Sequence, residues 1–170
     1  MPESRDQYIH RLGRTGRAGK EGQGILVLAP FESKFVSEVK DLDIPVNEEI
    51  SQLLKHPVDP QTMQNLNSVF NRIRSGDAKL TLSAQQAYQA FIGYYRGQLK
   101  RTAFRNTEQL VDVANECSRL MGLKEVPGLT KKAAGKMGLQ RLPNVRIVDE
   151  LERGSRRNQG GKRGKKTSSK

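Results

Sequence analysis

The sequence predicts a short α/β segment, then an all-α segment, then a disordered basic tail. Residues 1–45 contain "GILVLA" at positions 24–29, a continuous apolar run that is typical of a buried strand. Residues 46–148 place apolar side chains at helical spacing between capping signals. Residues 149–170 are dense in Arg, Lys, Gly and Ser, which indicates disorder.

The first segment opens with a predicted short helix and a glycine-rich loop. Ser4 and Gln7 have capping-box spacing, so we expect a helix that ends at about Leu12. Glycines recur through residues 13–24 and keep the backbone open. A loop of this length suggests a function.

The order helix, loop, buried strand, helix is typical of the end of an α/β sheet domain. After the apolar run, residues 32–42 place Phe35, Val36 and Val39 at helical spacing. One strand cannot form a sheet by itself. We therefore expect the rest of this domain to precede Met1.

Capping signals predict the helices of the second segment. Asp59, followed by Pro60, marks the first helix, Ser83 the second, Asn106 the third and Thr130 the fourth. The apolar residues expected to face inward are Met63, Leu66, Phe70 and Ile73 in the first helix, Ala84, Ala87, Tyr88, Phe91, Ile92, Tyr95 and Leu99 in the second, and Leu110, Val113, Ala114, Cys117, Leu120 and Met121 in the third, with Gly122 and Gly138 as helix ends.

The charge indicates a polyanionic partner. The net charge is +12 and the pI is about 10.1, with +7 in residues 83–148 and another +7 in residues 151–170. Nucleic acid is the first candidate. An anionic membrane surface is the weaker alternative, because arginine dominates over the aromatic and leucine faces that membranes select.

Disulfide and metal chemistry are not indicated by the composition. Cys117 is the single cysteine, so we expect it to pack as a small hydrophobic residue. Together with His10 and His56 it is too little for a metal site, and we expect no metal.

The stretch "HRLGRTGR" at residues 10–17 places three arginines and a histidine within eight positions. Arginine presents a planar fork of donors that matches phosphate oxygens. Gly13 and Gly16 interrupt the helix in which these guanidinium groups would share one face and repel. The pattern favours an anion-binding turn, with a solvated basic turn as the alternative.

The longer stretch "YIHRLGRTGRAGKEGQG" resembles the last conserved motif of DEAD-box RNA helicases, His-Arg-x-Gly-Arg-x-Gly-Arg. The flanking "MPES…DQYIH" and "G-ILVLAPFE" resemble the second RecA-like lobe of that family. The resemblance implies that residues 1–45 are the end of this lobe. It also implies that Arg14 and Arg17 are arginine fingers in the ATP site, with His10 in support, whereas Arg11 is structural or interlobe.

The departures from the family pattern limit what this chain does alone. No G-x-x-x-x-G-K-[ST] sequence and no Asp-Glu-Ala-Asp run is present. The resemblance implies a parent ATP-dependent RNA helicase that uses ATP and Mg²⁺. Without the N-terminal helicase lobe, we expect the chain to bind neither and to be inactive. The alternative is a stand-alone, non-enzymatic RNA-binding module.

The second segment more loosely resembles the helical C-terminal extension of organellar DEAD-box RNA chaperones. The stretches "AYQAFIGYYRGQLKR", "LVDVANECSRLMGL" and "VPGLTKKAAGKMGLQRLPNVRI" carry this resemblance. It implies a mitochondrial or other organellar location, with the nucleolus as alternative, because nucleolar members have a similar aromatic-rich helix.

Basic residues follow the aromatic residues of the second helix, which is typical of single-strand binding. We predict that Arg96, Lys100, Arg101 and Arg105 contact RNA, as a single strand or short duplex, with a solvated face as the alternative. Tyr94 falls off the apolar stripe, which predicts that it stacks on a base.

Overall fold

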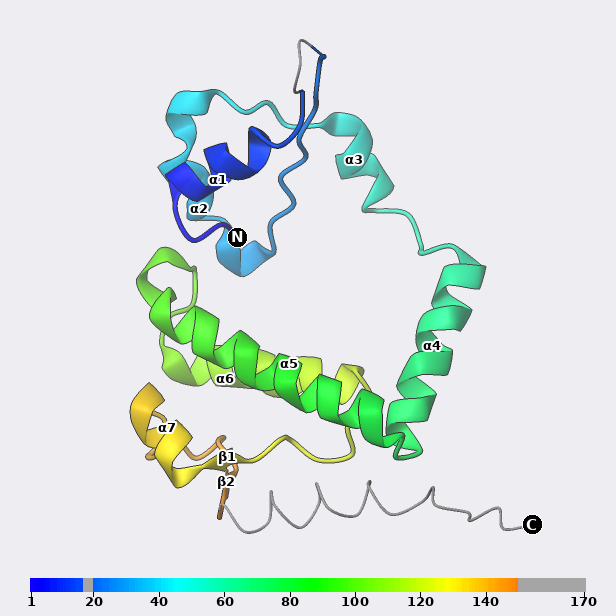
Figure 1. Ribbon diagram of the computed structural model, residues 1–170, viewed down its shortest axis with the longest axis vertical. Coiled ribbons are helices and arrows are strands. Elements are labelled where there is room, and N and C mark those ends of the chain that lie inside the picture. The colour runs from blue at the N-terminus through cyan, green and yellow to red at the C-terminus, as the bar shows by residue number, and fades with distance from the viewer. Residues whose placement is uncertain (17–19, 150–170) are drawn as a thin grey trace, which may run out of the picture.

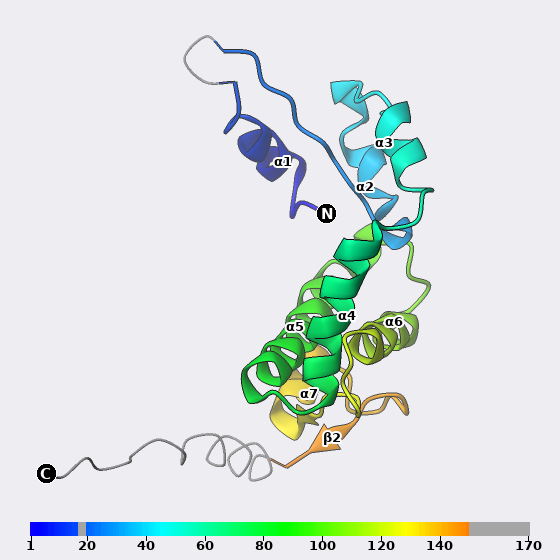
Figure 2. The same ribbon diagram turned by 90° about the vertical axis from the view of Figure 1, so that its right-hand side faces the viewer.

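The computed structural model describes residues 1–16 and 20–149 and arranges them in two layers (Figure 1). Helix α4 connects the layers along one side and lies against α5 (Figure 2). The predicted disorder of the tail lies outside the described residues, except for residue 149. The helices are α1 (Arg5–Leu12), α2 (Phe35–Glu38) and α3 (Glu48–Leu53) in the first layer, α4 (Pro60–Arg74), and α5 (Ala78–Gly97), α6 (Thr107–Leu120) and α7 (Lys131–Met137) in the second.

The predicted first helix is confirmed. The Ser4 side chain accepts a hydrogen bond from the Gln7 N–H at 3.1 Å and so satisfies a free donor of the first turn of α1. The buried face of α1 presents Tyr8 to Phe35, with an edge-on ring contact of 6.2 Å. Tyr8, Phe35 and Val39 form the N-terminal cluster, which gives the first layer a small core of its own.

The helix predicted over residues 32–42 is mostly replaced by shorter turns. Only α2 is α-helical, and 3₁₀ turns at Pro30–Glu32 and Lys40–Leu42 flank it. Phe35 and Val39 are buried as predicted, whereas Val36 is 56% exposed. The helical spacing therefore predicted burial correctly for Phe35 and Val39, which join the N-terminal cluster, and not for Val36.

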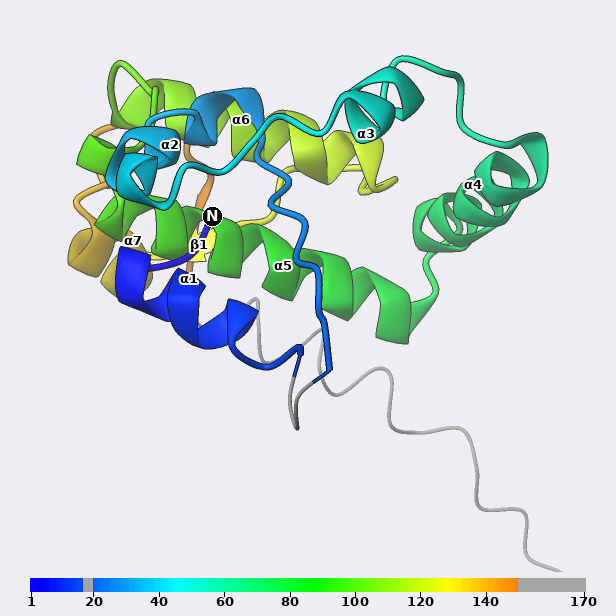
Figure 3. The same ribbon diagram turned by 90° about the horizontal axis from the view of Figure 1, so that it is seen from above.

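The strand predicted at residues 24–29 is not formed. Figure 3 shows this segment as extended chain that runs from the end of α1 back towards α2. Leu26 and Leu28 pack on the N-terminal cluster, but Ile25 and Val27 are 63% and 61% exposed. A strand is stabilised by hydrogen bonds to a neighbouring strand, and the described residues place none beside this segment.

Helix α4 begins as predicted, but its apolar stripe is buried only towards its end. The Asp59 carboxylate accepts from the Thr62 N–H at 2.9 Å. Met63 and Leu66 remain 41% and 42% exposed, while Phe70 and Ile73 pack into a cluster with α5. The reason is geometric, because α4 meets α5 near its C-terminal end (Figure 1).

Helix α5 starts earlier than predicted. Its N-cap is Asp77, whose side chain accepts from the Leu80 N–H at 3.0 Å, and Ser83 lies within the helix. Gly76, with φ of 90°, turns the chain sharply just before this cap. Of the residues predicted to face inward, Ala84, Tyr88 and Ile92 are buried in α5, Phe91 and Tyr95 are half-buried, and Ala87 is exposed. Leu99 is half-buried but lies in the 3₁₀ turn after α5.

Helix α6 starts at the predicted cap, Asn106, which accepts from the Gln109 N–H at 2.9 Å. Leu110 and Ala114 are buried as predicted, but Leu120 is 64% exposed. The buried face of α6 also includes polar residues that its apolar pattern did not indicate, Asn115 and Ser118.

The second segment was predicted to be all-α, but it contains a small parallel sheet. Strand β1 (Leu129–Thr130) pairs with β2 (Ile147–Val148), with Leu129 opposite Ile147 and Thr130 opposite Val148. Helix α7 lies between them in sequence and has the predicted ends, Thr130 and Gly138. Strands of two residues are too short to show an alternating pattern.

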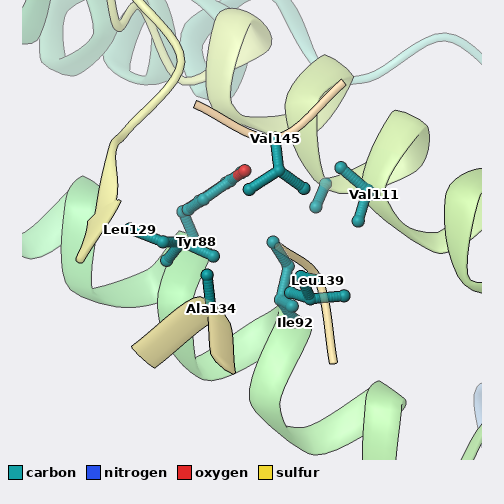
Figure 4. Packing of buried hydrophobic residues seen from close by; sticks show 8 residues of the cluster. Tyr88, Ile92, Val111, Leu129, Ala134, Leu139 and Val145 are labelled. Atoms are coloured by element: carbon teal, nitrogen blue, oxygen red, sulfur yellow. The ribbon is translucent and has the colours of Figure 1, made fainter. Parts of the chain in front are cut away.

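The main core joins α5, α6, β1 and α7 (Figure 4). At its centre the Tyr88 hydroxyl donates to the Asn115 side-chain oxygen at 2.9 Å, and burial raises the pKa of Tyr88 to about 12. Asn115 in turn donates to the carbonyl of Asn144 at 2.9 Å. The residues of this core are Tyr88, Ile92, Val111, Ala114, Leu129, Ala134, Leu139 and Val145.

Glycine at position 122 is required by the contact between α4 and the end of α6. Gly122 has φ of 91°, and a Cβ there would lie 2.5 Å from the carbonyl oxygen of Phe70. We expect Gly122→Ala to lower the free energy of unfolding by about 2 kcal/mol or more, from left-handed strain plus the clash, measured by urea titration.

The matched control is Gly93→Ala, within α5, where a Cβ meets nothing within 4 Å. There alanine should stabilise the chain by roughly 0.5–1 kcal/mol through helix propensity. Equal changes in the free energy of unfolding for the two substitutions would contradict the requirement for glycine at position 122.

Candidate functional site

The arginine turn, residues 10–17, lies at the C-terminal end of α1. His10 and Arg11 occupy the last turn of the helix, and the Arg14 N–H donates to the Arg11 carbonyl at 3.1 Å. The side chains of these three residues are exposed, and none forms a hydrogen bond or ion pair with another described residue. Arg17 lies outside the described residues. The turn therefore presents cations that no acidic group of the described chain neutralises.

The loop that carries the turn is closed at its base by two glycines. Gly16 has φ of 66°, and a Cβ on Gly22 would lie 2.5 Å from the Gly16 nitrogen and 2.6 Å from the Thr15 hydroxyl oxygen. The two arms of the loop thus approach more closely than side chains permit. The glycines of the motif are needed for this closure as well as for ending α1.

A hollow of about 590 Å³ lies beside the turn. Its lining includes Arg11, Arg14, Thr15 and residues 23–27, and none of the described residues that line it is acidic. His10 is not part of this lining. Two guanidinium groups in a hollow without carboxylates suit a phosphate or another anion.

The described residues provide no metal site. No group of three or more His, Cys, Asp or Glu residues in them is placed to hold a metal ion. Likewise, no helix within residues 1–16 and 20–149 has both the length and the apolar character needed to cross a bilayer.

The four basic residues predicted to contact RNA do not share one environment. Lys100 and Arg105 are exposed, and their side chains form no hydrogen bond or ion pair with the described part of the chain. The Arg96 Nε donates to the Met137 carbonyl at 3.0 Å, which ties the end of α5 to α7. Only the first two are therefore free in the folded chain.

Arg101 is held by residues from the first layer. Its guanidinium forms a forked pair with the Glu38 carboxylate, with both nitrogen–oxygen distances 2.7 Å. Hydrogen bonding to Glu38 raises the pKa of Arg101. Further donors reach the carbonyls of Pro2 and Glu3 and the side chain of Gln98.

Tyr94, which was predicted to stack on a base, is also held against the first layer. Its hydroxyl donates to the Met1 carbonyl at 2.9 Å, and its ring meets the ring of Tyr95 edge-on at 5.0 Å. Burial raises the pKa of Tyr94.

The two layers meet through Phe31, a residue that sequence reasoning missed. Its ring stacks on Phe104 with a centroid distance of 4.7 Å and meets Tyr95 edge-on at 5.1 Å. The Ala103 N–H donates to the Phe31 carbonyl at 2.7 Å. No local pattern marks residue 31, because all of these partners lie more than 60 residues away in sequence.

Glu32, next to Phe31, is the buried charge of this interface. It is 5% exposed and accepts from the Tyr95 hydroxyl at 2.6 Å and the Ala29 N–H at 2.8 Å, and it also contacts the Met1 amino group. Burial acts to raise the pKa of Glu32, but these hydrogen bonds outweigh it, and the net pKa is lowered. We call Phe31, Glu32, Glu38, Tyr95 and Arg101 the docking interface.

Comparison with known proteins finds similarity to DEAD-box ATP-dependent RNA helicases. The chain is 44% identical over 147 residues to DEAD-box ATP-dependent RNA helicase 26 and 40% identical over 154 residues to helicase 25, both of Arabidopsis thaliana, matches that cover 86% and 90% of this chain. It is 39% identical over 152 residues, 86% of the chain, to the mitochondrial ATP-dependent RNA helicase MSS116 of Phaeosphaeria nodorum. The matched segments are 16%, 25% and 25% of those relatives, so the chain spans only a minor part of their length. No family model and no solved structure matches the chain.

Protonation of Glu32 should weaken the docking interface. The folded pKa of Glu32 lies below its ordinary value of 4.5, so its contribution is present above that pH and is lost as the pH falls through the folded pKa. We expect thermal stability to fall below pH 4.5, and Glu32→Gln to remove part of that fall. Thermal unfolding followed by circular dichroism at several pH values measures this.

The matched control is Glu21→Gln, at an exposed loop carboxylate. The melting temperature of this variant should fall with decreasing pH as that of the unmodified chain does. Superimposable profiles for all three proteins would contradict a role for the Glu32 charge.

Proposed function

We propose that this chain, which is homologous to part of the DEAD-box ATP-dependent RNA helicases, supplies arginine fingers for ATP hydrolysis and an RNA-binding extension to such a helicase. The observation that carries the proposal is the arginine turn. It matches the family motif at every defined position, and its described cations are exposed and unpaired beside a hollow to which the described residues contribute no acidic group.

In the proposed reaction, Arg14 and Arg17 stabilise the negative charge that spreads over the transferring γ-phosphoryl group. A positioned arginine of this kind raises the rate by roughly 10³ to 10⁵. His10 supports the arginine network from the last turn of α1. We propose that ATP and Mg²⁺ are held mainly by parts of the helicase outside this chain, since a phosphate-binding loop sequence is not found in it.

The lobe assignment is part of the same proposal. Residues 1–45 would be the end of a RecA-like lobe, in which the extended segment at residues 24–29 is a strand of a larger sheet. The alternation of its exposed and packed side chains supports this, because Ile25 and Val27 are free on the face opposite Leu26 and Leu28.

RNA contact is assigned to two regions. Lys100 and Arg105, with the remaining donors of Arg96, form the free basic groups beside the docking interface. The tail at residues 151–170 adds a net charge of +7. Both bind phosphates, so they recognise single strands and short duplexes by charge.

A stand-alone RNA-binding module is the competing proposal, and it leaves the arginine turn without a role. The similarity to a mitochondrial helicase of Phaeosphaeria nodorum supports a mitochondrial or other organellar location, with the nucleolus as the alternative.

The finger assignment is tested in a helicase of full length that contains this segment. We expect Arg14→Ala or Arg17→Ala to reduce RNA-stimulated ATP turnover by at least ~10³, with a much smaller change in ATP affinity. Lys124→Ala, at an exposed lysine of the second layer, is the control and should leave turnover unchanged. Near-normal turnover in both arginine variants would rule out the fingers.

Salt dependence separates the RNA contacts. Each phosphate neutralised on a single strand contributes about 0.7 to the slope of log K against log salt, so Lys100→Ala with Arg105→Ala should flatten it by roughly 1 to 2 units. Deletion of residues 151–170 should flatten it further. Binding of a single-stranded RNA is titrated at several salt concentrations.

The control for charge alone is the pair Lys55→Ala and Lys124→Ala, both at exposed positions outside the proposed contacts. This pair removes the same formal charge. A slope change equal to that of the test pair would contradict the assigned contacts.

A further inference from the structure

We propose that Arg101 is a positioning residue that clamps the start of α1 and the helix α2 onto the 3₁₀ turn (Leu99–Arg101) that follows α5, and so holds the arginine turn in place. Sequence alone grouped Arg101 with the RNA contacts. The clamp is inferred from geometry, and only its consequence for ATP turnover rests on the proposed function.

The first argument is the number of donors. A guanidinium has five N–H groups, and those of Arg101 have five acceptors within the chain. Nε and one donor of Nη2 reach the two Glu38 oxygens, and the other Nη2 donor reaches the Pro2 carbonyl at 3.4 Å. The two donors of Nη1 reach the Glu3 carbonyl at 2.6 Å and the Gln98 side-chain oxygen at 2.7 Å. No donor remains for a phosphate.

The second argument is where those acceptors lie. Pro2 and Glu3 directly precede Ser4, the N-cap of α1, and they are 99 and 98 residues from Arg101 in sequence. Helix α1 has eight residues and is about 12 Å long. A contact that holds its first residues in place therefore also sets the position of Arg14, which comes shortly after its last residue.

The third argument is the environment of the pair. The side chains of Arg101 and Glu38 are 23% and 32% exposed, so water screens the pair less than a surface pair. The Phe35 ring of the N-terminal cluster lies 5.8 Å from the guanidinium carbon. Removing Arg101 leaves a partly buried carboxylate and two carbonyls without a donor.

The neighbouring cations show the contrast. Lys100 and Arg105 lie on the same stretch of chain, and neither side chain has an acceptor in the described residues. The basic stretch between α5 and α6 therefore has two roles, in which Arg101 holds the first layer and its neighbours remain available to a polyanion.

Hydrogen exchange and RNA titration of the intact chain test the clamp. We expect Arg101→Ala to speed exchange of the α1 amides by about 10-fold or more, because local opening becomes easier. The salt slope for a single-stranded RNA should stay within about 0.3 of the unmodified value, since no phosphate contact is lost. Lys100→Ala should do the reverse, with α1 exchange unchanged and the slope shallower.

Arg101→Lys keeps the positive charge and removes the planar guanidinium. This variant therefore tests the clamp if Arg101→Ala does not fold. The clamp predicts faster α1 exchange in this variant, because a lysine cannot reproduce the paired bonds to Glu38. A phosphate contact predicts no change. The effects of Glu38→Ala and Arg101→Ala on the melting temperature should also be less than additive.

Unchanged α1 exchange in Arg101→Lys, or a slope in Arg101→Ala as shallow as in Lys100→Ala, would overturn the clamp. These readouts do not involve ATP. Normal turnover in Arg14→Ala would therefore remove the finger proposal and leave the clamp standing.

Discussion

The arrangement of the two layers depends on the docking interface, where Phe31 inserts among aromatic rings and Arg101 pairs with Glu38. Among the described residues the N-terminal cluster has three buried side chains, too few to offset the conformational entropy of the segment that it holds. The second layer has a larger core of its own. The first layer therefore gains its fixed position by attachment to α5.

The partners of each cation distinguish structural from functional charges. Arg101 uses every donor inside the chain, and Arg96 uses one. The side chains of Arg11 and Arg14 in the arginine turn have no hydrogen bond or ion pair with the described residues, and the same is true of the Lys100 side chain. A partly buried charge needs its partner, because loss of that partner destabilises the fold, whereas a cluster of unpaired cations repels itself and is stabilised when an anion binds.

Features with a local cause were predictable from sequence. The caps at Ser4, Asp59, Asn106 and Thr130 are confirmed, because a capping side chain bonds a backbone N–H three residues away at most. Residues 24–29, predicted as a strand, are extended but unpaired in the described residues, since a strand requires a partner that local sequence does not supply. The sheet of β1 and β2 was missed, as pairing between residues 18 positions apart leaves no short-range pattern.

The sequence by itself determined the composition of the arginine turn and the similarity to DEAD-box ATP-dependent RNA helicases, because spacing within eight residues is a local property that a motif retains. The tertiary structure decided which basic residues are free and which are occupied. Glu38 lies 63 residues from Arg101, and Glu32 lies 63 residues from Tyr95. Such pairings follow from how the layers pack, so only the folded chain separates a clamp from the exposed cations beside it.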